Sequence, residues 1–131
     1  MTLGALLIPL LASGEQEFTY VPENTAYEGS YVSADYIPRV TAKPNCSCVL
    51  FVRDMGLMVY GNARDMKPNI SEPIEGGGVL FKGAIGHVAY ILRVEVDSVI
   101  IVESNHSPCK ITYRRISRNS ASIKGFISPK K

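Results

Sequence analysis

The chain has few of the residues that would reveal its class at once. It has three cysteines, two histidines, no internal repeat and no low-complexity tract. Neither CxxC nor HxxxH spacing is present, so we expect no metal and no cofactor. A length of 131 residues allows one domain with its own core, and an apolar fraction of 46% is typical of a globular protein rather than a disordered one.

Long hydrophobic runs are also lacking. The apolar run at residues 3–12 is too short to span a bilayer, so we expect no stable membrane insertion. It is similar to the apolar part of an export signal, with small residues for cleavage at Ala12-Ser13-Gly14, although no Lys or Arg precedes it. The alternative is an apolar tail that packs on the domain or on a partner.

Basic residues are absent from the first 38 positions, which hold five acids, whereas the remainder holds 14 bases and seven acids. A basic face of this kind attracts anionic polymers, which include nucleic acid and cell-wall polymer. No basic motif interleaved with aromatic residues is present, so we expect no nucleic-acid partner. The basic residues near the end of the chain are Arg114, Arg115, Arg118, Lys124, Lys130 and Lys131.

The apolar pattern divides the chain in two. Residues 1–42 lack sustained periodicity and predict an irregular N-terminal arm, and residues 43–131 predict the folded domain. Within the domain, residues 48–55 are apolar, with Asn45 or Ser47 as the N-cap and Gly56 as the stop. This pattern indicates a short buried helix, and its valines make a strand the competing assignment.

β-branched runs dominate from Gly76 onward. They predict strands at residues 79–81, 87–94, 99–103, 110–116 and 123–127. The predicted fold is α+β, with a short helix packed on a small antiparallel sheet of four to six strands. If Val96-Asp97 is a two-residue hairpin turn, His87 lies opposite residue 106, and Glu103 and Asn105 lie at the same end of the ribbon.

The catalytic groups of a cysteine hydrolase could be supplied by Cys48, by His87 and by the pair Glu103 and Asn105. The thiol attacks, the imidazole moves the proton, and a carboxylate or amide orients the imidazole. The predicted helix N-terminus and an imidazolium would both stabilise the thiolate. The backbone N–H of Cys48 would donate to the oxyanion, and Gly86 would leave space for the substrate backbone.

Each of these residues also has an alternative. Cys46 begins the same segment and is the alternative nucleophile, and His106 is a rival to His87. Cys109 is expected in the core or in a strand. Zinc bound by Cys46, Cys48, Cys109 and one histidine is a further alternative, which the spacing does not favour. An odd number of cysteines fits a reactive thiol better than a scaffold held by disulfides, and three buried structural thiols remain the other interpretation.

Four strings in the second part of the chain resemble a CHAP domain, over about residues 43–129. CHAP domains are cysteine amidases and endopeptidases of the papain-like NlpC/P60 superfamily, found in bacterial wall hydrolases and phage lysins. The strings are Asn45-Cys46-Ser47-Cys48-Val49-Leu50-Phe51-Val52, Tyr60-Gly61-Asn62-Ala63, Gly86-His87-Val88-Ala89-Tyr90 and Glu103-Ser104-Asn105.

The resemblance implies a papain-like fold with Cys48 as nucleophile, His87 as base, and Glu103 and Asn105 as orienting groups. It also implies peptidoglycan as substrate, cleaved as by an N-acetylmuramoyl-L-alanine amidase or by an endopeptidase of the peptide stem or cross-bridge. The chain departs from the family in its two competing cysteines and in lacking an acidic calcium-binding loop and a wall-binding module. Targeting would then come from the basic face, the N-terminal arm or a partner such as a phage tail protein.

The sequence therefore predicts a thiol hydrolase of cell-wall amide bonds. Its expected location is extracellular, at the cell wall or within a phage particle. The alternative is a non-catalytic wall-binding or phage structural protein that keeps the same fold.

Overall fold

The computed structural model describes residues 15–21, 31–33 and 36–129. The apolar run at residues 3–12, and with it the predicted export signal, lies outside the described residues. In chain order the elements are β1 (Glu15–Val21), β2 (Tyr31–Ser33), α1 (Cys48–Asp54), the 3-10 helix η2 (Ala63–Asp65), β3 (Gly78–Phe81), β4 (His87–Val94), β5 (Ser98–Ser107), β6 (Lys110–Ser117) and β7 (Ile123–Ile127).

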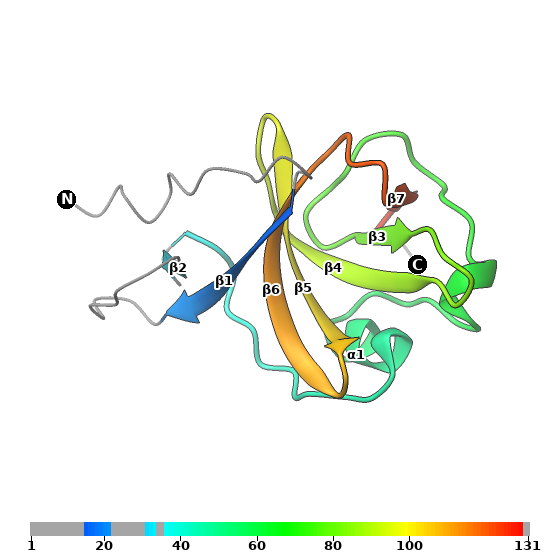
Figure 1. The fold of residues 1–131 in the computed structure, drawn as a ribbon, viewed down its shortest axis with the longest axis horizontal. Helices are drawn as coiled ribbons and strands as arrows, with labels where there is room; N and C mark the ends of the chain where they lie inside the picture. Colours follow the sequence, from blue (N-terminus) through cyan, green and yellow to red (C-terminus); the bar gives the residue numbers. More distant parts are fainter. Residues whose placement is uncertain (1–14, 22–30, 34–35, 130–131) are drawn as a thin grey trace.

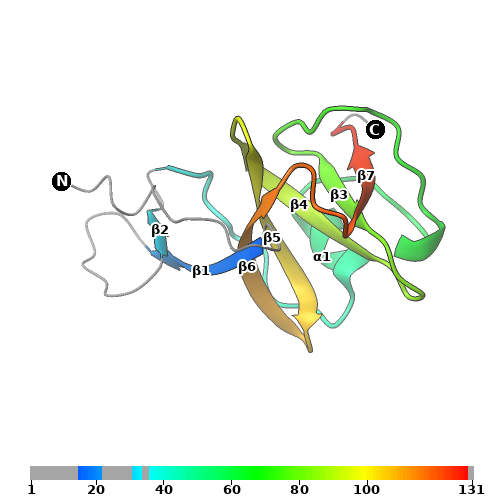
Figure 2. The same cartoon turned by 45° about the horizontal axis from the view of Figure 1, so that its top comes forward.

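Five antiparallel strands form the centre of the molecule, in the order β6-β5-β4-β3-β7 (Figures 1 and 2). Helix α1 lies against β4 and β5, which confirms the predicted α+β class with one short helix on a small antiparallel sheet. In the described part of the chain, no helix is both long enough and apolar enough to cross a membrane.

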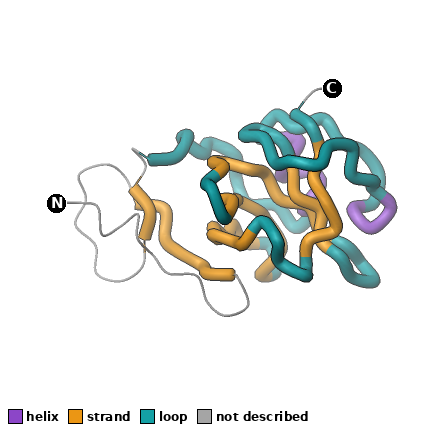
Figure 3. The backbone as a smooth tube through the Cα atoms, turned by 90° about the horizontal axis from the view of Figure 1, so that it is seen from above, coloured by secondary structure: helices purple, strands orange, loops and turns teal. Residues whose placement is uncertain are grey.

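Two further strands lie in the segment that was predicted to be irregular. β1 pairs antiparallel with β6, and β2 pairs parallel with β1, so the sheet extends to seven strands on that side (Figure 3). The run Phe18-Thr19-Tyr20-Val21 has the aromatic and β-branched composition of a strand. The prediction of an irregular arm was therefore wrong for β1 and β2, because β6 offers an edge on which such a run can pair.

Helix α1 begins and ends at residues that fit those positions. The Ser47 side chain accepts a hydrogen bond from the Leu50 N–H, as an N-cap does, and Gly56 follows the last turn at a φ of 110°. The helix buries Phe51 and Val52 completely against the sheet, which stabilises the fold by about 2 kcal/mol per side chain. Because it is held by this packing and by its cap, the segment is a helix despite its valines.

The β4–β5 hairpin contains a bulge that the sequence did not predict. Near the turn the pairs are Arg93 with Ile100 and Val94 with Val99, in the predicted register. Beyond the extra residue Leu92 the register shifts, so that Ile91 pairs with Ile101 and Tyr90 with Val102. The shift decides which side chains share a face of the sheet, because a one-residue slip moves every side chain to the opposite face.

The bulge brings two of the predicted site residues together. In the observed register Glu103 continues opposite Ala89, on the same face as His87. In the predicted register it would lie opposite Tyr90 and point away from His87. The structure thus joins this pair through an irregularity of the hairpin rather than through the regular ribbon that we expected.

Candidate active site

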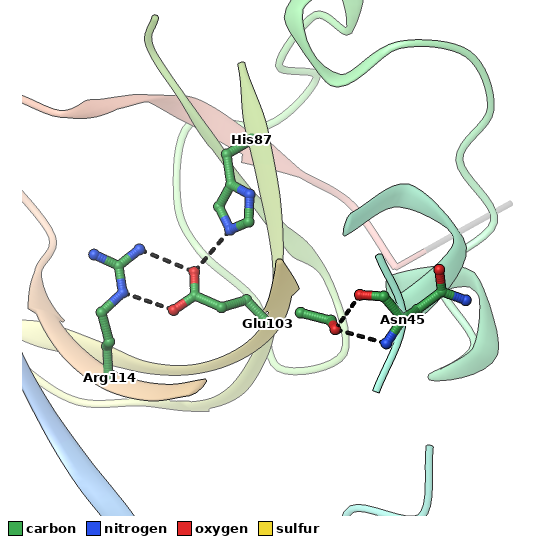
Figure 4. A network of polar contacts seen from close by, with 5 residues as sticks. Asn45, His87, Glu103 and Arg114 are labelled. Carbon is green, nitrogen blue, oxygen red and sulfur yellow. Dashed lines mark hydrogen bonds and ion pairs between the residues drawn. The ribbon is translucent and has the colours of Figure 1, made fainter. Parts of the chain in front are cut away.

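Cys48 is the first residue of α1, and β5 holds the segment before it in place. The Ser104 hydroxyl accepts a hydrogen bond from the Asn45 N–H at 2.8 Å and donates one to the Asn45 carbonyl at 2.5 Å (Figure 4). The Asn45 Oδ1 in turn accepts from the Ser47 N–H at 2.8 Å, so Asn45 shapes the turn and Ser47 is the cap. These bonds fix the start of α1 relative to β5.

The neighbouring residue on β5 binds the imidazole. Nε2 of His87 lies 2.8 Å from Oε1 of Glu103, whose side chain is completely buried. Arg114 on β6 binds the same carboxylate through two hydrogen bonds, Nε to Oε2 at 2.7 Å and an Nη to Oε1 at 2.9 Å. Figure 4 shows His87 and Arg114 reaching the Glu103 carboxylate from two sides. Adjacent residues of β5 thus position both the imidazole and the helix that carries the thiol.

The thiol and the imidazole perturb each other. Burial alone would raise the pKa of Cys48, but hydrogen bonds from the His87 ring and from the Val88 backbone, together with the charge of His87, lower it below its ordinary value. Burial would likewise lower the pKa of His87, yet its hydrogen bonds to Cys48 and Glu103 and their negative charges raise it to about 9. Both shifts favour a thiolate–imidazolium pair at neutral pH.

Glu103 and Asn105, the two predicted orienting groups, have different surroundings. Burial opposes ionisation of Glu103, but hydrogen bonds from His87 and Arg114 and their charges hold the pKa of its carboxyl below the ordinary value. Asn105 is exposed, has a φ of 70°, and accepts a hydrogen bond from the Cys109 N–H at 2.7 Å. Glu103 therefore contacts the imidazole, and Asn105 shapes the β5–β6 turn at the rim of the site.

Cys46, the alternative nucleophile, has no free thiol in this structure. It forms a disulfide with Cys109, which leaves Cys48 as the free cysteine. Cys109 lies exposed in the turn between β5 and β6, at a φ of 57°, so the expectation of a core or strand position was wrong. The disulfide also removes two of the thiolates that the zinc alternative needed.

His106, the rival imidazole, is exposed, and its ring centre lies 5.9 Å from that of His87. Ring nitrogens of these two histidines and a carboxylate oxygen of Glu103 lie within 4.8 Å of one another, a spacing that could suit a metal ion. However, Arg114 occupies both oxygens of Glu103. A carboxylate already paired with a guanidinium is a poor ligand for a second cation, so the arrangement fits an ion pair better than a metal centre.

The free thiol opens onto a cleft of about 550 Å³. Its walls come from the start of α1 and the residues just before it, from the segment that includes η2, from the loop before β4 and from the end of β5. The lining residues are Cys46, Ser47, Cys48, Val49, Leu50, Arg53, Gly61, Asn62, Ala63, Arg64, Ile85, Gly86 and Asn105.

Gly86 has a structural role that the sequence did not predict. Its φ is 77°, and a Cβ placed there would come within 2.5 Å of the Arg64 backbone. The missing side chain therefore makes room for η2. Lys124 holds the same segment from the other side, since its Nζ donates to the Arg64 carbonyl at 3.1 Å and to the Met66 carbonyl at 2.7 Å.

The predicted basic face near the end of the chain does not form as expected. Arg114 and Arg115 are buried and paired with Glu103 and Glu95, and Arg118 pairs with Glu72. Lys124 binds backbone carbonyls, and residues 130–131 lie outside the described part. A count of charges in the sequence could not separate buried, paired arginines from solvated ones.

Two residues of this site were missed in the sequence. Arg114 was counted only as part of a basic face, and Ser104 only as the middle of a motif. The signal for Arg114 was present, because the run Ile111-Thr112-Tyr113-Arg114-Arg115-Ile116 places charges inside an apolar strand. A buried arginine requires an acidic partner, and an acid on the neighbouring predicted strand was available.

Comparison of the chain with protein-family models, with curated proteins and with solved structures finds no match.

Proposed function

We propose that this protein is a thiol hydrolase that cleaves an amide bond of peptidoglycan, with Cys48 as nucleophile, His87 as acid and base, and Glu103 as the group that orients His87. The observation that carries the proposal is the 2.8 Å bond between His87 Nε2 and Glu103 Oε1 beside a free thiol whose pKa the same imidazole lowers. A cleft at that thiol gives a substrate access to it.

In this proposal each ring nitrogen of His87 has its own role. Because Nε2 is bonded to Glu103, Nδ1 is the nitrogen left for Cys48. The thiolate of Cys48 attacks the carbonyl carbon of the amide and forms a tetrahedral oxyanion. The backbone N–H of Cys48, at the start of α1, is suited to donate to that oxygen.

Collapse of the intermediate breaks the C–N bond, and His87 donates its Nδ1 proton to the leaving amine. The product is a thioester between Cys48 and the acyl part of the substrate. Neutral His87 then takes a proton from water, the hydroxide attacks the thioester, and the carboxylic acid leaves as the thiolate is restored. Throughout, Glu103 accepts the Nε2–H bond and keeps the ring in one tautomer.

The finer fold and the biological setting follow from the same proposal. A helix that presents a cysteine at its N-terminus to a histidine on a packed antiparallel sheet fits a papain-like arrangement and the resemblance to CHAP domains. Peptidoglycan is the substrate that this resemblance implies, and it places the protein outside the cell, at the wall or in a phage particle. Whether the bond cut is that of an amidase or of an endopeptidase is read from the product masses.

The test is release of muropeptides from purified peptidoglycan, followed by mass spectrometry. We expect release by the wild type and none by Cys48→Ala, because the attacking sulfur is gone. The control is the double variant Cys46→Ser/Cys109→Ser, which loses two sulfurs of the same neighbourhood but keeps the nucleophile, and should retain measurable release. Absence of release by the wild type from several wall types would favour the non-catalytic wall-binding or phage structural alternative.

A further inference from the structure

The cleft at Cys48 has an uneven charge. Among its described lining residues are two arginines, Arg53 and Arg64, and neither an aspartate nor a glutamate. A cleft lined in this way favours a substrate that carries negative charge near the bond to be cut.

Both arginines are held at the cleft by contacts of their own. The Arg53 guanidinium lies 4.5 Å from the centre of the Tyr60 ring, a cation–π contact that restricts its side chain. The Arg64 backbone is fixed between Gly86, where a Cβ would not fit, and the Lys124 amine. The site therefore has two guanidinium groups on elements whose positions are set by the fold.

Among the described residues, neither guanidinium is neutralised by a strong ion pair. Arg64 is 3.8 Å from Asp65, and the two side chains are 59% and 68% exposed, an arrangement that contributes little in water. Arg53 is only partly exposed, and its described contact is with the Tyr60 ring. Arginine binds a carboxylate in a planar, two-bond geometry, which makes a carboxylate the ligand best suited to these groups.

Arg53 and Arg64 both line the cleft onto which the Cys48 thiol opens. We propose that Arg53 and Arg64 form a carboxylate-binding subsite of this cleft, which selects wall peptides with a free carboxylate close to the scissile amide. This inference rests on the proposed function and narrows its substrate class.

The test separates binding from cleavage by using Cys48→Ala as the background. Two synthetic stem peptides are compared by calorimetry, identical except that one position carries a carboxylate (D-isoglutamate) in the first and a carboxamide (D-isoglutamine) in the second. We expect the carboxylate peptide to bind about tenfold more tightly, as a charge-assisted hydrogen bond to arginine allows. Arg53→Gln and Arg64→Gln should each bring the ratio of the two dissociation constants closer to one.

The matched control is Lys43→Gln, which removes the same charge from an exposed residue that does not line the cleft. It should leave the ratio unchanged. Equal binding of the two peptides, no binding of either at millimolar concentration, or an equal effect of Lys43→Gln would overturn the subsite. Preferential binding of the carboxylate peptide, with no cleavage of it when Cys48 is present, would leave the subsite standing and remove the hydrolase proposal.

Discussion

Arg114 and Glu103 form a two-bond ion pair in which both side chains are almost fully buried, and the same carboxylate holds His87. The pair therefore does more than satisfy two buried charges. Together with His87, Arg114 keeps Glu103 ionised, and an ionised Glu103, together with Cys48, raises the pKa of His87. Arg114 acts on the proposed chemistry through Glu103, as a positioning residue.

Replacing Arg114 should change the pH dependence as well as the stability. In Arg114→Met the Glu103 carboxyl loses its main stabilising charge, so its pKa rises and it takes up a proton at a higher pH. The acid limb of kcat/KM should then move to higher pH, and the fold should lose about 3 to 5 kcal/mol because a buried charge is left unpaired. Arg114→Lys keeps the charge but not the two-bond geometry. It should therefore restore part of the stability and part of the original position of the acid limb.

Arg115→Met is the matched control for this variant. Arg115 is equally buried and forms the same kind of pair with Glu95, at the opposite end of β4 from His87. The Arg115→Met variant should lower the free energy of unfolding by a similar amount but leave the pH profile of the folded protein unchanged. If the two arginine variants shift the profile alike, Arg114 has only a structural role.

The pH profile of the wild type follows from the coupled thiol and imidazole. The acid limb should lie below the ordinary pKa of a thiol, because the pKa of Cys48 is lowered. The basic limb should lie near pH 9, where His87 loses the proton that it must give to the leaving amine. The two limbs belong to the pair rather than to either residue alone.

Iodoacetamide labelling of Cys48 measures the acid limb without any substrate. We expect fast labelling at neutral pH in the wild type and a shift of the labelling curve to higher pH in His87→Ala. Glu103→Gln should move the basic limb of activity to lower pH, because a neutral amide no longer stabilises the imidazolium. Slow labelling at neutral pH in a folded wild type would contradict the thiolate–imidazolium pair.

The strands and the helix could be predicted from the sequence wherever a segment has one regular hydrophobic periodicity. The limits of β4 and β7 match the predicted ranges, since β-branched runs there are bounded by turn residues. The helix at Cys48 was predicted from its cap and stop, although its composition also suited a strand. These features are local, and local structure is what composition and hydrophobic periodicity can predict.

The arrangement of the site depends on features that the sequence does not display. The bulge at Leu92 shifts the register of the β4–β5 hairpin by one residue, and without it Glu103 would point away from His87. The pairing of Cys46 with Cys109 depends on where the β5–β6 turn falls. Residue types at the site could therefore be predicted, whereas their contacts required the register of the sheet.

The Cys46–Cys109 disulfide predicts a dependence of both stability and thiol reactivity on redox conditions. It closes a loop of 63 residues, so its loss should lower the free energy of unfolding by about 4 kcal/mol. It also joins the segment just before Cys48 to the turn that follows Glu103. We expect reduction, or Cys46→Ser/Cys109→Ser, to lower Tm and to slow iodoacetamide labelling of Cys48 in the protein that stays folded.

The control for the disulfide is the double variant treated with the same reductant. It has no disulfide left to reduce, so its Tm and labelling rate should not change further. An unchanged Tm in the wild type after complete reduction, verified by mass spectrometry of alkylated thiols, would show that the Ser104–Asn45 hydrogen bonds alone hold this segment.

Glu95 predicts the behaviour of the fold in acid. Burial opposes its ionisation, but hydrogen bonds from Arg115, Ser98 and Tyr36 lower its pKa from an ordinary 4.5 to about 2. A carboxyl whose pKa is lowered by folding stabilises the fold at pH values above its ordinary pKa. It loses that contribution as the pH falls toward its pKa in the folded state. We therefore expect about 3 kcal/mol from Glu95 at neutral pH, lost between about pH 5 and pH 2.

Thermal unfolding of wild type and Glu95→Gln across that range measures the contribution. The two proteins should differ most near neutral pH, and their Tm values should approach each other as the pH falls to about 2, because the protonated carboxyl is then also neutral. Glu72→Gln is the matched control, since Glu72 is 73% exposed and its ion pair within the described part of the chain is with Arg118 at the surface. Its effect should stay below about 1 kcal/mol at every pH. A constant difference between wild type and Glu95→Gln from pH 7 to pH 2 would mean that lost packing, and not the charge of Glu95, accounts for the effect.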